Sequence, residues 1–506
     1  MPLPSISGAA AGAAAGAVTG GLNAGGPVGS GMSYKQLQDK YQDFALPQVS
    51  ITLAGTPFSN SSGDMVIGDV SVELTSGFEA SIARFRIYHV YDGQSGTFRF
   101  EEVSRQLAMG TALTIQMGYL GSMEDVFVGF VAGVSFDYEE GQLPYIEVTG
   151  MDVKGIMMAG TYSNQLTADN YADAVREILQ RTGYERLKTG GGIVDIQVTD
   201  TPDLDPTLLT AQQAAETAQA AAEQAQQAAE AAELAAAAGG PEAVAAAQSL
   251  KEQAQQALSA VETAMRTFQE AKAALSAAKE ASKQAAAALA QAPSPSPTPV
   301  PMGPTSAYTI EMVAESDYEF VVKAAKKFNF EFFVDRGTVY FRKAKSNRQV
   351  LMELGSGSGI ISFHVEYSIT GIVGSIEARA MDAGGGQVIS AKETFSNNLS
   401  TGSTAGGLVS KGRKVLIDPT ISSQAQADAR VASLMERMSY RLGTLEAECI
   451  GIPDLVPGRF IRLSGLGAPA DNTFYITSVV HEYRDENGYR TRITGCTDKV
   501  DRGTML

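Results

Sequence analysis

The residues of this chain that could do acid, base or metal chemistry are few and widely separated. The 506-residue sequence holds three histidines, His89, His364 and His481, each within a predicted alternating strand. Their separation does not match the close His-to-His spacing of a metal site. There is also no Gly-x-Ser-x-Gly nucleophile elbow and no phosphate-binding Walker loop. We therefore predict no catalytic residue, no metal ligand and no cofactor, and we do not expect an enzyme.

Two pairs of adjacent acids need separate attention, because glycosidases work with two carboxylates placed across a sugar. The pairs are Glu139-Glu140 and Asp485-Glu486. Each falls in a predicted hairpin turn, where charge is ordinary on a protein surface. The two turns hold equivalent places in a repeated pattern described below, which favours a role in the turns over catalysis.

The two cysteines, Cys449 and Cys496, lie in predicted strands of the same C-terminal region. Their spacing resembles no metal motif, and we expect reduced, buried thiols. The formal charge of −17, with 39 basic and 56 acidic residues, argues against specific nucleic-acid binding. Residues 8–21 are apolar mainly through alanine and follow no basic segment, so we predict neither a signal peptide nor stable membrane insertion. We expect the protein to be made in a cytoplasm.

A cassette of three strands occurs twice in the sequence. Each copy opens on a glycine before an alternating strand and closes on Thr-Gly followed shortly by Asp and Lys, at 149–154 and at 494–499. This agreement in order and spacing predicts two copies of one small antiparallel β domain, although any two meanders share glycine turns and alternation. The Asn487-Gly488 pair predicts a type I′ turn. The copies are 110–118, 126–136 and 145–151, then 458–465, 474–483 and 489–496.

The strands before the first cassette, at 49–53, 70–74 and 83–88, bring the first domain to five or six strands, which suggests a closed or nearly closed barrel. A helix follows from Thr167, a possible cap, to Gly183. Far downstream, residues 316–319 form a capping box before a second helix. That helix runs into a hairpin at 330–342, and these pieces predict a small α+β unit.

Residues 207–301 form an insertion rich in Ala, Gln and Glu that ends in a Pro-rich spacer. Four-three spacing of Leu, Val, Phe and Ala predicts a coiled-coil seam in its second arm, and an all-Ala seam in its first arm. We predict an antiparallel helical hairpin, with a solvated Ala-rich helix as the alternative. The predicted seam positions are 250, 254, 257, 261, 264, 268, 271, 275, 278, 282, 285 and 289, and in the first arm 211, 214, 218, 221, 225, 228, 232 and 235.

The predicted fold class is therefore α+β and mainly β: two similar antiparallel β-barrel domains joined by a small α+β unit that carries a long helical insertion. A flexible Gly/Ala-rich arm precedes them. The predicted domains are the arm at 1–45, the first barrel at 46–160, the α+β unit at 161–206 and 302–345, the helical hairpin and Pro-rich linker at 207–301, and the second barrel at 346–506.

This order of parts resembles the late control D family, the baseplate hub proteins of contractile phage tails, and the N-terminal part of VgrG spike proteins. The resemblance is carried by Phe127-Val-Gly-Phe-Val131, by Glu315-Ser-Asp-Tyr-Glu-Phe320, by Pro457-Gly458 and by Val479-Val-His481. It covers about 46–205 and 306–500, and it says nothing about the arm or the insertion.

The resemblance implies a homotrimeric hub in which two barrels from each subunit make a pseudo-sixfold ring. Such a hub adapts a hexameric tail tube to a central spike, so the implied partners are the tail tube protein, a separate spike protein, and other baseplate or tape-measure proteins. It implies a place in the virion tail baseplate or an injection-system particle, assembled in the bacterial cytoplasm. The alternatives are a tail-associated cell-wall hydrolase and a receptor-binding module.

Overall fold

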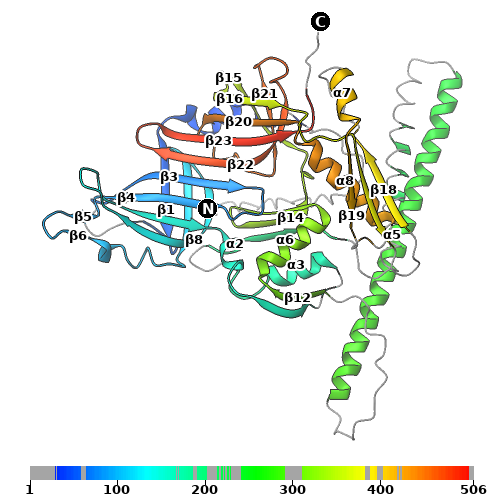
Figure 1. Cartoon of the computed structure of the whole chain (residues 1–506), viewed down its shortest axis with the longest axis horizontal. Helices are drawn as coiled ribbons and strands as arrows, with labels where there is room; N and C mark the ends of the chain where they lie inside the picture. The colour runs from blue at the N-terminus through cyan, green and yellow to red at the C-terminus, as the bar shows by residue number, and fades with distance from the viewer. Residues whose placement is uncertain are drawn as a thin grey trace, which may run out of the picture. The chain divides into compact units, whose positions relative to one another are not determined.

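The structure, a computed structural model, is mainly β, as the sequence predicts (Figure 1). Residues 26–201 and 309–506 form one compact unit, and 1–25 with 202–308 form another. The structure describes residues 29, 31–58, 64–166, 168, 170–185, 191–201, 214–215, 218–219, 221–222, 225–226, 228–229, 241–290, 310–381, 388–395, 403–418, 421 and 424–500.

The first part of a large sheet has the strand order β2-β1-β7-β8-β9-β4-β3, and all its neighbours are antiparallel. Every strand of the predicted first barrel is present. Within the described residues no pairing joins β1 to β3 to close this barrel, because β3 pairs with β22 instead. The strands are β1 Pro47–Leu53, β2 Thr56–Pro57, β3 Val66–Thr75, β4 Ile82–Tyr88, β7 Ala112–Tyr119, β8 Ser122–Asp137 and β9 Tyr145–Met151.

The second part of the sheet closes on itself in the order β22-β21-β15-β16-β20-β23, since β22 also pairs with β23. Only β15 runs parallel to its neighbours, and its contact with β16 is two residue pairs long. The strands are β15 Val350–Ser356, β16 Gly359–Tyr367, β20 Gly443–Ile450, β21 Phe460–Ser464, β22 Thr473–Arg484 and β23 Gly488–Thr497.

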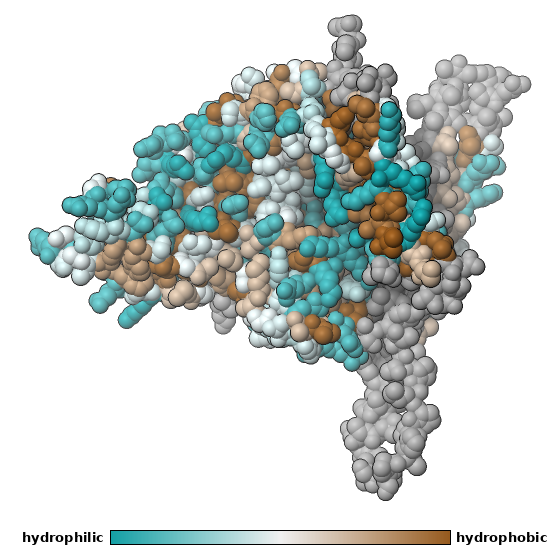
Figure 2. Space-filling model, viewed as in Figure 1, coloured by the Kyte–Doolittle hydropathy of each residue, from teal (hydrophilic) through white to brown (hydrophobic). Residues whose placement is uncertain are grey.

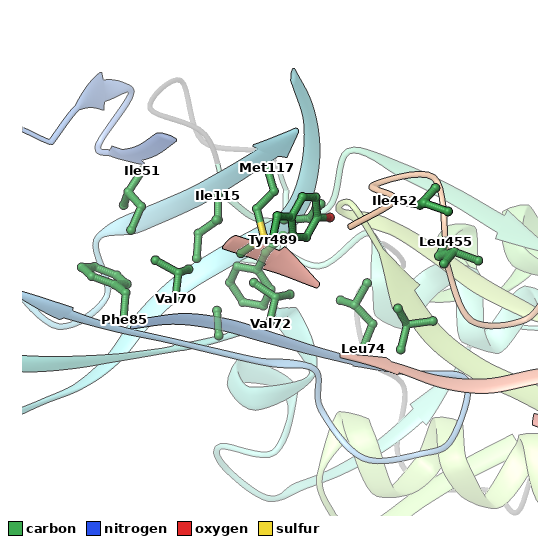
Figure 3. Packing of buried hydrophobic residues seen from close by; sticks show 14 of the residues in the cluster. Ile51, Val70, Val72, Leu74, Phe85, Ile115, Met117, Ile452, Leu455 and Tyr489 are labelled. Carbon is green, nitrogen blue, oxygen red and sulfur yellow. The ribbon is translucent and has the colours of Figure 1, made fainter. Parts of the chain in front are cut away.

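One continuous hydrophobic core takes buried side chains from both parts of the sheet. It includes Phe85 and Ile115 from the first part and Ile476 and Ile493 from the second. Figure 3 shows a section of this packing, in which labelled residues of β3 lie near Tyr489 and the segment that carries Ile452. Along β4, β9 and β23, fully buried residues alternate with half-buried or exposed ones, and the fully buried residues form the inward face of each strand.

A segment before β1 packs onto this core from outside. Its helix α1 (Tyr34–Lys40) begins with a capping box and is followed by the short helix η1 (Gln42–Phe44). Lys40 forms ion pairs at 2.9 Å with Glu124 of β8 and with Asp454, so it links the first part of the sheet to the segment between β20 and β21. The short elements β5 Tyr91–Asp92, β6 Thr97–Phe98 and η2 Phe100–Glu102 connect β4 to β7.

The α+β unit has the elements that the sequence predicts. Ser316 and Glu319 form the predicted capping box of α6, and the predicted hairpin is β13 with β14. The predicted cap Thr167 lies outside the described residues, and the N-cap of α3 is Asn170, which accepts from the Asp173 N–H. The elements are α2 Val153–Met157, β10 Tyr162–Leu166, α3 Tyr171–Leu179, β11 Asp195–Val198, β12 Ile310–Glu315, α6 Asp317–Phe328, β13 Phe330–Asp335 and β14 Thr338–Lys343.

The range predicted as the second barrel also contains a small α/β module with a core of its own, which the sequence analysis did not separate. Three strands in the order β18-β17-β19 pack against α8, and Ile376, Ala378 and Val431 are buried between them. The module lies in the chain between β16 and β20. Its elements are β17 Ser375–Met381, β18 Val388–Thr394, α7 Ser403–Val409, β19 Arg413–Ile417 and α8 Gln424–Ser439.

In the other compact unit, the helix α5 (Pro241–Ala290) occupies the predicted second arm. Between 248 and 271 the predicted seam positions are the buried or half-buried ones, and every other position is exposed. In the first arm the described positions agree with the prediction in part: 218 and 225 are half-buried as predicted, whereas 214, 221 and 228 are exposed and their neighbours 215, 222 and 229 are buried. At 214 and 215, at 221 and 222, and at 228 and 229 both neighbours are Ala, so residue type does not distinguish the buried position from the exposed one.

Candidate functional site

The three histidines lie in three unrelated environments. His89 lies just past the end of β4, in the left-handed region at φ 59°, and not within a strand as predicted. His364 is exposed on β16. His481 of β22 is fully buried, and burial lowers its pKa to about 3. Within the described residues, no group of three metal-ligating side chains gathers anywhere.

The acid pairs and the cysteines also lie apart from one another. Glu139-Glu140 and Asp485-Glu486 are exposed in the turns after β8 and β22, as predicted. The second turn is not type I′, because Gly488 has a positive φ of 65° and Asn487 does not. Both cysteines are free thiols. Among the helices in the described parts of the chain, none is long and apolar enough to span a membrane.

The feature that stands out is that the two parts of the large sheet repeat one strand order. The strand order in the first part is β1-β7-β8-β9-β4-β3, and in the second part it is β15-β21-β22-β23-β20-β16. Strands at the same place in the two orders also have the same rank along the chain: β1 and β15 come first, β3 and β16 second, and so on. The first strand departs from the repeat, because β1 is antiparallel to β7 whereas β15 is parallel to β21. The two meanders β7-β8-β9 and β21-β22-β23 are the cassettes found in the sequence.

The opening glycines of the two cassettes make the same hydrogen bonds. The Gly110 N–H donates to the carbonyl of Val131 at 2.8 Å, and the Val131 N–H donates back to the residue after Gly110 at 2.8 Å. The Gly458 N–H donates to Ile476 at 2.9 Å, and the Ile476 N–H donates back to the residue after Gly458 at 2.8 Å. Both glycines have positive φ, 86° and 78°.

The equivalence continues through the next strand. Val131 lies opposite Gly150 and Ile476 lies opposite Gly495, the two glycines of the closing Thr-Gly motifs. One residue after each pair the register shifts, so both long strands carry a β-bulge at the same place. The glycines that the sequence predicts to be equivalent therefore lie on equivalent strands.

The two parts of the sheet join through the outer half of β22. Its residues from Ser478 to Tyr483 pair antiparallel with Thr75 to Val70 of β3. We call this pairing the seam; in Figure 1, β22 and β3 lie side by side there. On its inner face Val70, Val72 and His481 are 1%, 0% and 0% exposed. The seam thus extends the sheet and buries side chains from both strands.

The strands that correspond to β22 and β3 are β8 and β16, and both present an open edge. Beyond Phe130, β8 pairs only with β9, and beyond Ile360, β16 pairs only with β20 among the described residues. These segments expose Phe136 (47%), Tyr138 (59%) and Phe363 (42%). Figure 2 shows tan and brown surface near β6 and β8. Sheet edges with exposed aromatic residues are sites where another strand can pair.

A sequence signal for this site was present and was missed. Residues 70–75 read Val-Ser-Val-Glu-Leu-Thr, and residues 363–368 read Phe-His-Val-Glu-Tyr-Ser. In the structure these segments are equivalent. In the first part of the sheet, Val72 lies opposite Ala83, which lies opposite Gly150. In the second part, Val365 lies opposite Leu445, which lies opposite Gly495.

The α+β hairpin supports the second part of the sheet through buried charge. Glu331 accepts from the Arg342 guanidinium at 2.6 Å and from the Tyr475 hydroxyl. Burial raises the pKa of Glu331 and that of Tyr475. Arg342 also donates to the Gly458 carbonyl at 2.7 Å, which fixes the turn that opens the second cassette.

Comparison with known proteins gives a match for the fold. A sequence model of the Alg8 N-terminal domain matches residues 302–485, which is less than half of the chain. No curated protein sequence matches. The 43 kDa tail protein of prophage MuSo2 from Shewanella oneidensis superimposes with a TM-score of 0.53 at 11% identity, over 90% of this chain and 100% of that chain. This chain has the fold of that tail protein.

Two further solved structures are similar over most of this chain at lower scores. The tail protein from Neisseria meningitidis MC58 has a TM-score of 0.49 at 10% identity, covering 90% of this chain and 97% of that chain. A component of the type VI secretion system of E. coli has a TM-score of 0.42 at 9% identity, covering 90% of this chain and 80% of that chain.

Proposed function

We propose that this chain is a structural baseplate hub of a contractile tail or injection system. In this role it is a homotrimeric adaptor between a hexameric tail tube and a central spike. The observation that carries the proposal is the repeated strand order, joined edge to edge at the seam. We call each of the two parts of the large sheet a sheet unit. Three chains can supply six similar sheet units only if each chain supplies two, and this chain holds two sheet units with matching strands.

Three further features support the proposal. The two units derive from one duplicated β domain, since the cassettes share hydrogen bonds, paired glycines and bulges. The shared fold with the prophage tail protein favours a tail component over other classes. The partners that fit are the tail tube protein, a separate spike protein, and other baseplate or tape-measure proteins, in a virion tail assembled in the bacterial cytoplasm.

The alternatives predict other behaviour. A tail-associated cell-wall hydrolase needs two carboxylates facing one sugar, whereas the acid pairs lie in exposed turns of different units. Zymography on purified peptidoglycan tests this directly, and a lytic band from the pure chain would refute the structural role. A receptor-binding module would instead bind host cells, which a cell-adsorption assay with the labelled chain measures.

Sedimentation velocity over a range of concentrations tests the hub itself. We expect the mass of a trimer, three times 53.2 kDa, in exchange with monomer. A chain that stays monomeric at every concentration, alone and with tail tube and spike proteins, would overturn the proposal.

A further inference from the structure

The seam joins two kinds of sheet edge, and the chain carries each kind twice. One kind is the outer half of a long cassette strand, in β22 and β8. The other is the edge of β3 that faces away from β4, and the corresponding edge of β16 that faces away from β20. Within each chain β22 pairs with β3, while among the described residues β8 and β16 have no strand on these edges.

We infer that the β8 edge of one chain pairs with the β16 edge of a second copy, in the register of the seam. This inference rests on the proposed function and names the surface through which the copies join. The occupant is a second copy because the seam already shows these two edge types paired. Some equivalent positions also keep the same residue type: Tyr483 and Tyr138 on the long strands, and Val72 and Val365 with Glu73 and Glu366 on the others.

The equivalences above fix the register residue by residue. Ile476 corresponds to Val131, so Val480 and His481 correspond to Ser135 and Phe136. Their seam partners Glu73 and Val72 correspond to Glu366 and Val365. The pairs between copies are therefore Ser135 with Glu366, Phe136 with Val365, Asp137 with His364, and Tyr138 with Phe363.

We call this pairing between β8 of one copy and β16 of the next the joint. The side chains that meet in this register suit burial in such a joint. In the seam the inner face holds His481 with Val72 and Tyr483 with Val70, and three of these four are fully buried. The corresponding inner face between copies pairs Phe136 with Val365 and Tyr138 with Phe363, which are apolar or aromatic throughout.

The aromatic residues of β8 are only partly covered within their own chain. The ring of Phe136 lies 5.3 Å from that of Phe98 and 5.1 Å from that of Phe100, and Tyr138 lies 5.1 Å from Tyr91. Phe136 and Tyr138 nevertheless stay 47% and 59% exposed. Pairing would remove apolar surface from water on both strands, which favours association.

The outer face brings no like charges together. Asp137 faces His364, and the small Ser135 faces Glu366, just as Glu73 faces Val480 across the seam. The joint is heterologous, because the two copies contribute different edges, so successive copies either close into a ring or extend without end. Since seams and joints alternate, three chains give a ring of six sheet units.

Engineered disulfides test the register. Ser135→Cys with Glu366→Cys places two thiols opposite each other on the exposed outer face. Ser135→Cys with Ser362→Cys is the matched control, because residue 362 lies four positions along β16, about 13 Å away. Mild oxidation should give covalent trimers on a non-reducing gel with the first pair and monomers with the second.

Two other outcomes separate this inference from the proposed function. If sedimentation shows a trimer and the 135/366 pair gives no covalent product, the register is wrong and the hub proposal stands. If sedimentation shows only monomer under every condition, both fail. Equal cross-linking by both pairs would also contradict the register.

A charge substitution gives a second, independent readout. Phe363→Lys puts a charge opposite Tyr138 of the next copy, and Ile361→Lys is its matched control. Phe363 and Ile361 are 42% and 45% exposed on the same strand, but 361 lies outside the paired residues. Phe363→Lys should weaken association by roughly tenfold or more, and Ile361→Lys should leave it unchanged. Equal weakening by both would overturn the inference.

Discussion

The two cassette glycines, Gly110 and Gly458, adopt the same backbone conformation in different surroundings. A Cβ at position 458 would lie 2.6 Å from Phe333 Cζ, whereas at 110 it would meet nothing within 4 Å. Gly110→Ala should therefore cost only the positive-φ penalty, about 1–2 kcal/mol. Gly458→Ala should cost at least about 1 kcal/mol more through overpacking. Urea unfolding of both variants measures the difference, and equal losses would mean that Phe333 moves aside freely.

His481 gives the core a predictable pH dependence. Its Nε2 lies 3.1 Å from the Leu455 carbonyl, and its Nδ1 lies 2.8 Å from the Tyr489 hydroxyl. Since a carbonyl only accepts, Nε2 carries the proton and Nδ1 accepts from Tyr489, so the buried ring is neutral. Burial lowers its pKa from 6.5 to about 3.

The sign follows from linkage. The unfolded chain takes up a proton at this ring below about pH 6.5 and the folded chain does not until about pH 3, so stability falls as pH falls between them. Relative to His481→Gln, the wild-type chain should lose about 2 kcal/mol more between pH 7 and pH 5. Unfolding free energies from urea titrations at both pH values measure this, and parallel losses would contradict a neutral buried ring.

At the residue scale, the sequence predicted what local patterns encode. The paired Gly110 and Gly458 and the capping box at Ser316 needed only spacing and residue type, and the structure has them as predicted. The bond from Tyr475 to Glu331 joins residues far apart in sequence, and no local pattern signals it. The likeness of 70–75 to 363–368 is a weak signal, because the two segments share only two of six residue types.

At the element scale, periodicity identified the strands of the predicted first barrel, the three cassette strands of the second part of the sheet, and the buried face of α5 between 248 and 271. It did not separate the module of β17, β18, β19 and α8, because its strands have the same alternating texture as those around it. It also predicted a buried Ala214 where the neighbouring Ala215 is buried, because two adjacent alanines give the pattern nothing to distinguish them by.

The insertion at 207–301 is predicted to be dispensable for folding of the unit that holds the large sheet. Three buried clusters of that unit, which include the core of the large sheet, take no described residue from this range. Replacing 207–301 by a Gly/Ser linker should change the unfolding free energy of that unit by less than about 1 kcal/mol, because closure entropy varies slowly with loop length. Phe85→Ala, expected to cost about 3–5 kcal/mol, shows that the assay detects core loss.

Hydrogen-exchange protection of β7, β8 and β22 measures the outcome of that replacement. Native-like protection is the expected result. Loss of protection comparable to that of Phe85→Ala would make the insertion a part of the core architecture.

At the scale of the whole molecule, the sequence predicted two separate barrels, and the structure joins them into one 13-stranded sheet around one core. The difference lies in β3, which pairs with a strand about 400 residues later. Which of two equivalent edges a strand pairs with depends on the twist and position of complete sheets. The alternation of apolar and polar residues along a strand does not encode which edge it pairs with, so the pairing of β3 with β22 could not be predicted from the sequence.

Net charge gives the last prediction, which concerns the ring as a whole. Three chains of −17 carry 3 × (−17) = −51, so we expect the lining of the central channel to be neutral to acidic and to let nucleic acid pass without holding it. Binding to DNA releases counterions only where basic groups neutralise phosphates, and it then weakens steeply with salt. The purified trimer should therefore not shift a DNA duplex on a native gel, even at low salt. A retarded band that disappears as salt is raised would reveal a basic surface and contradict this view of the channel.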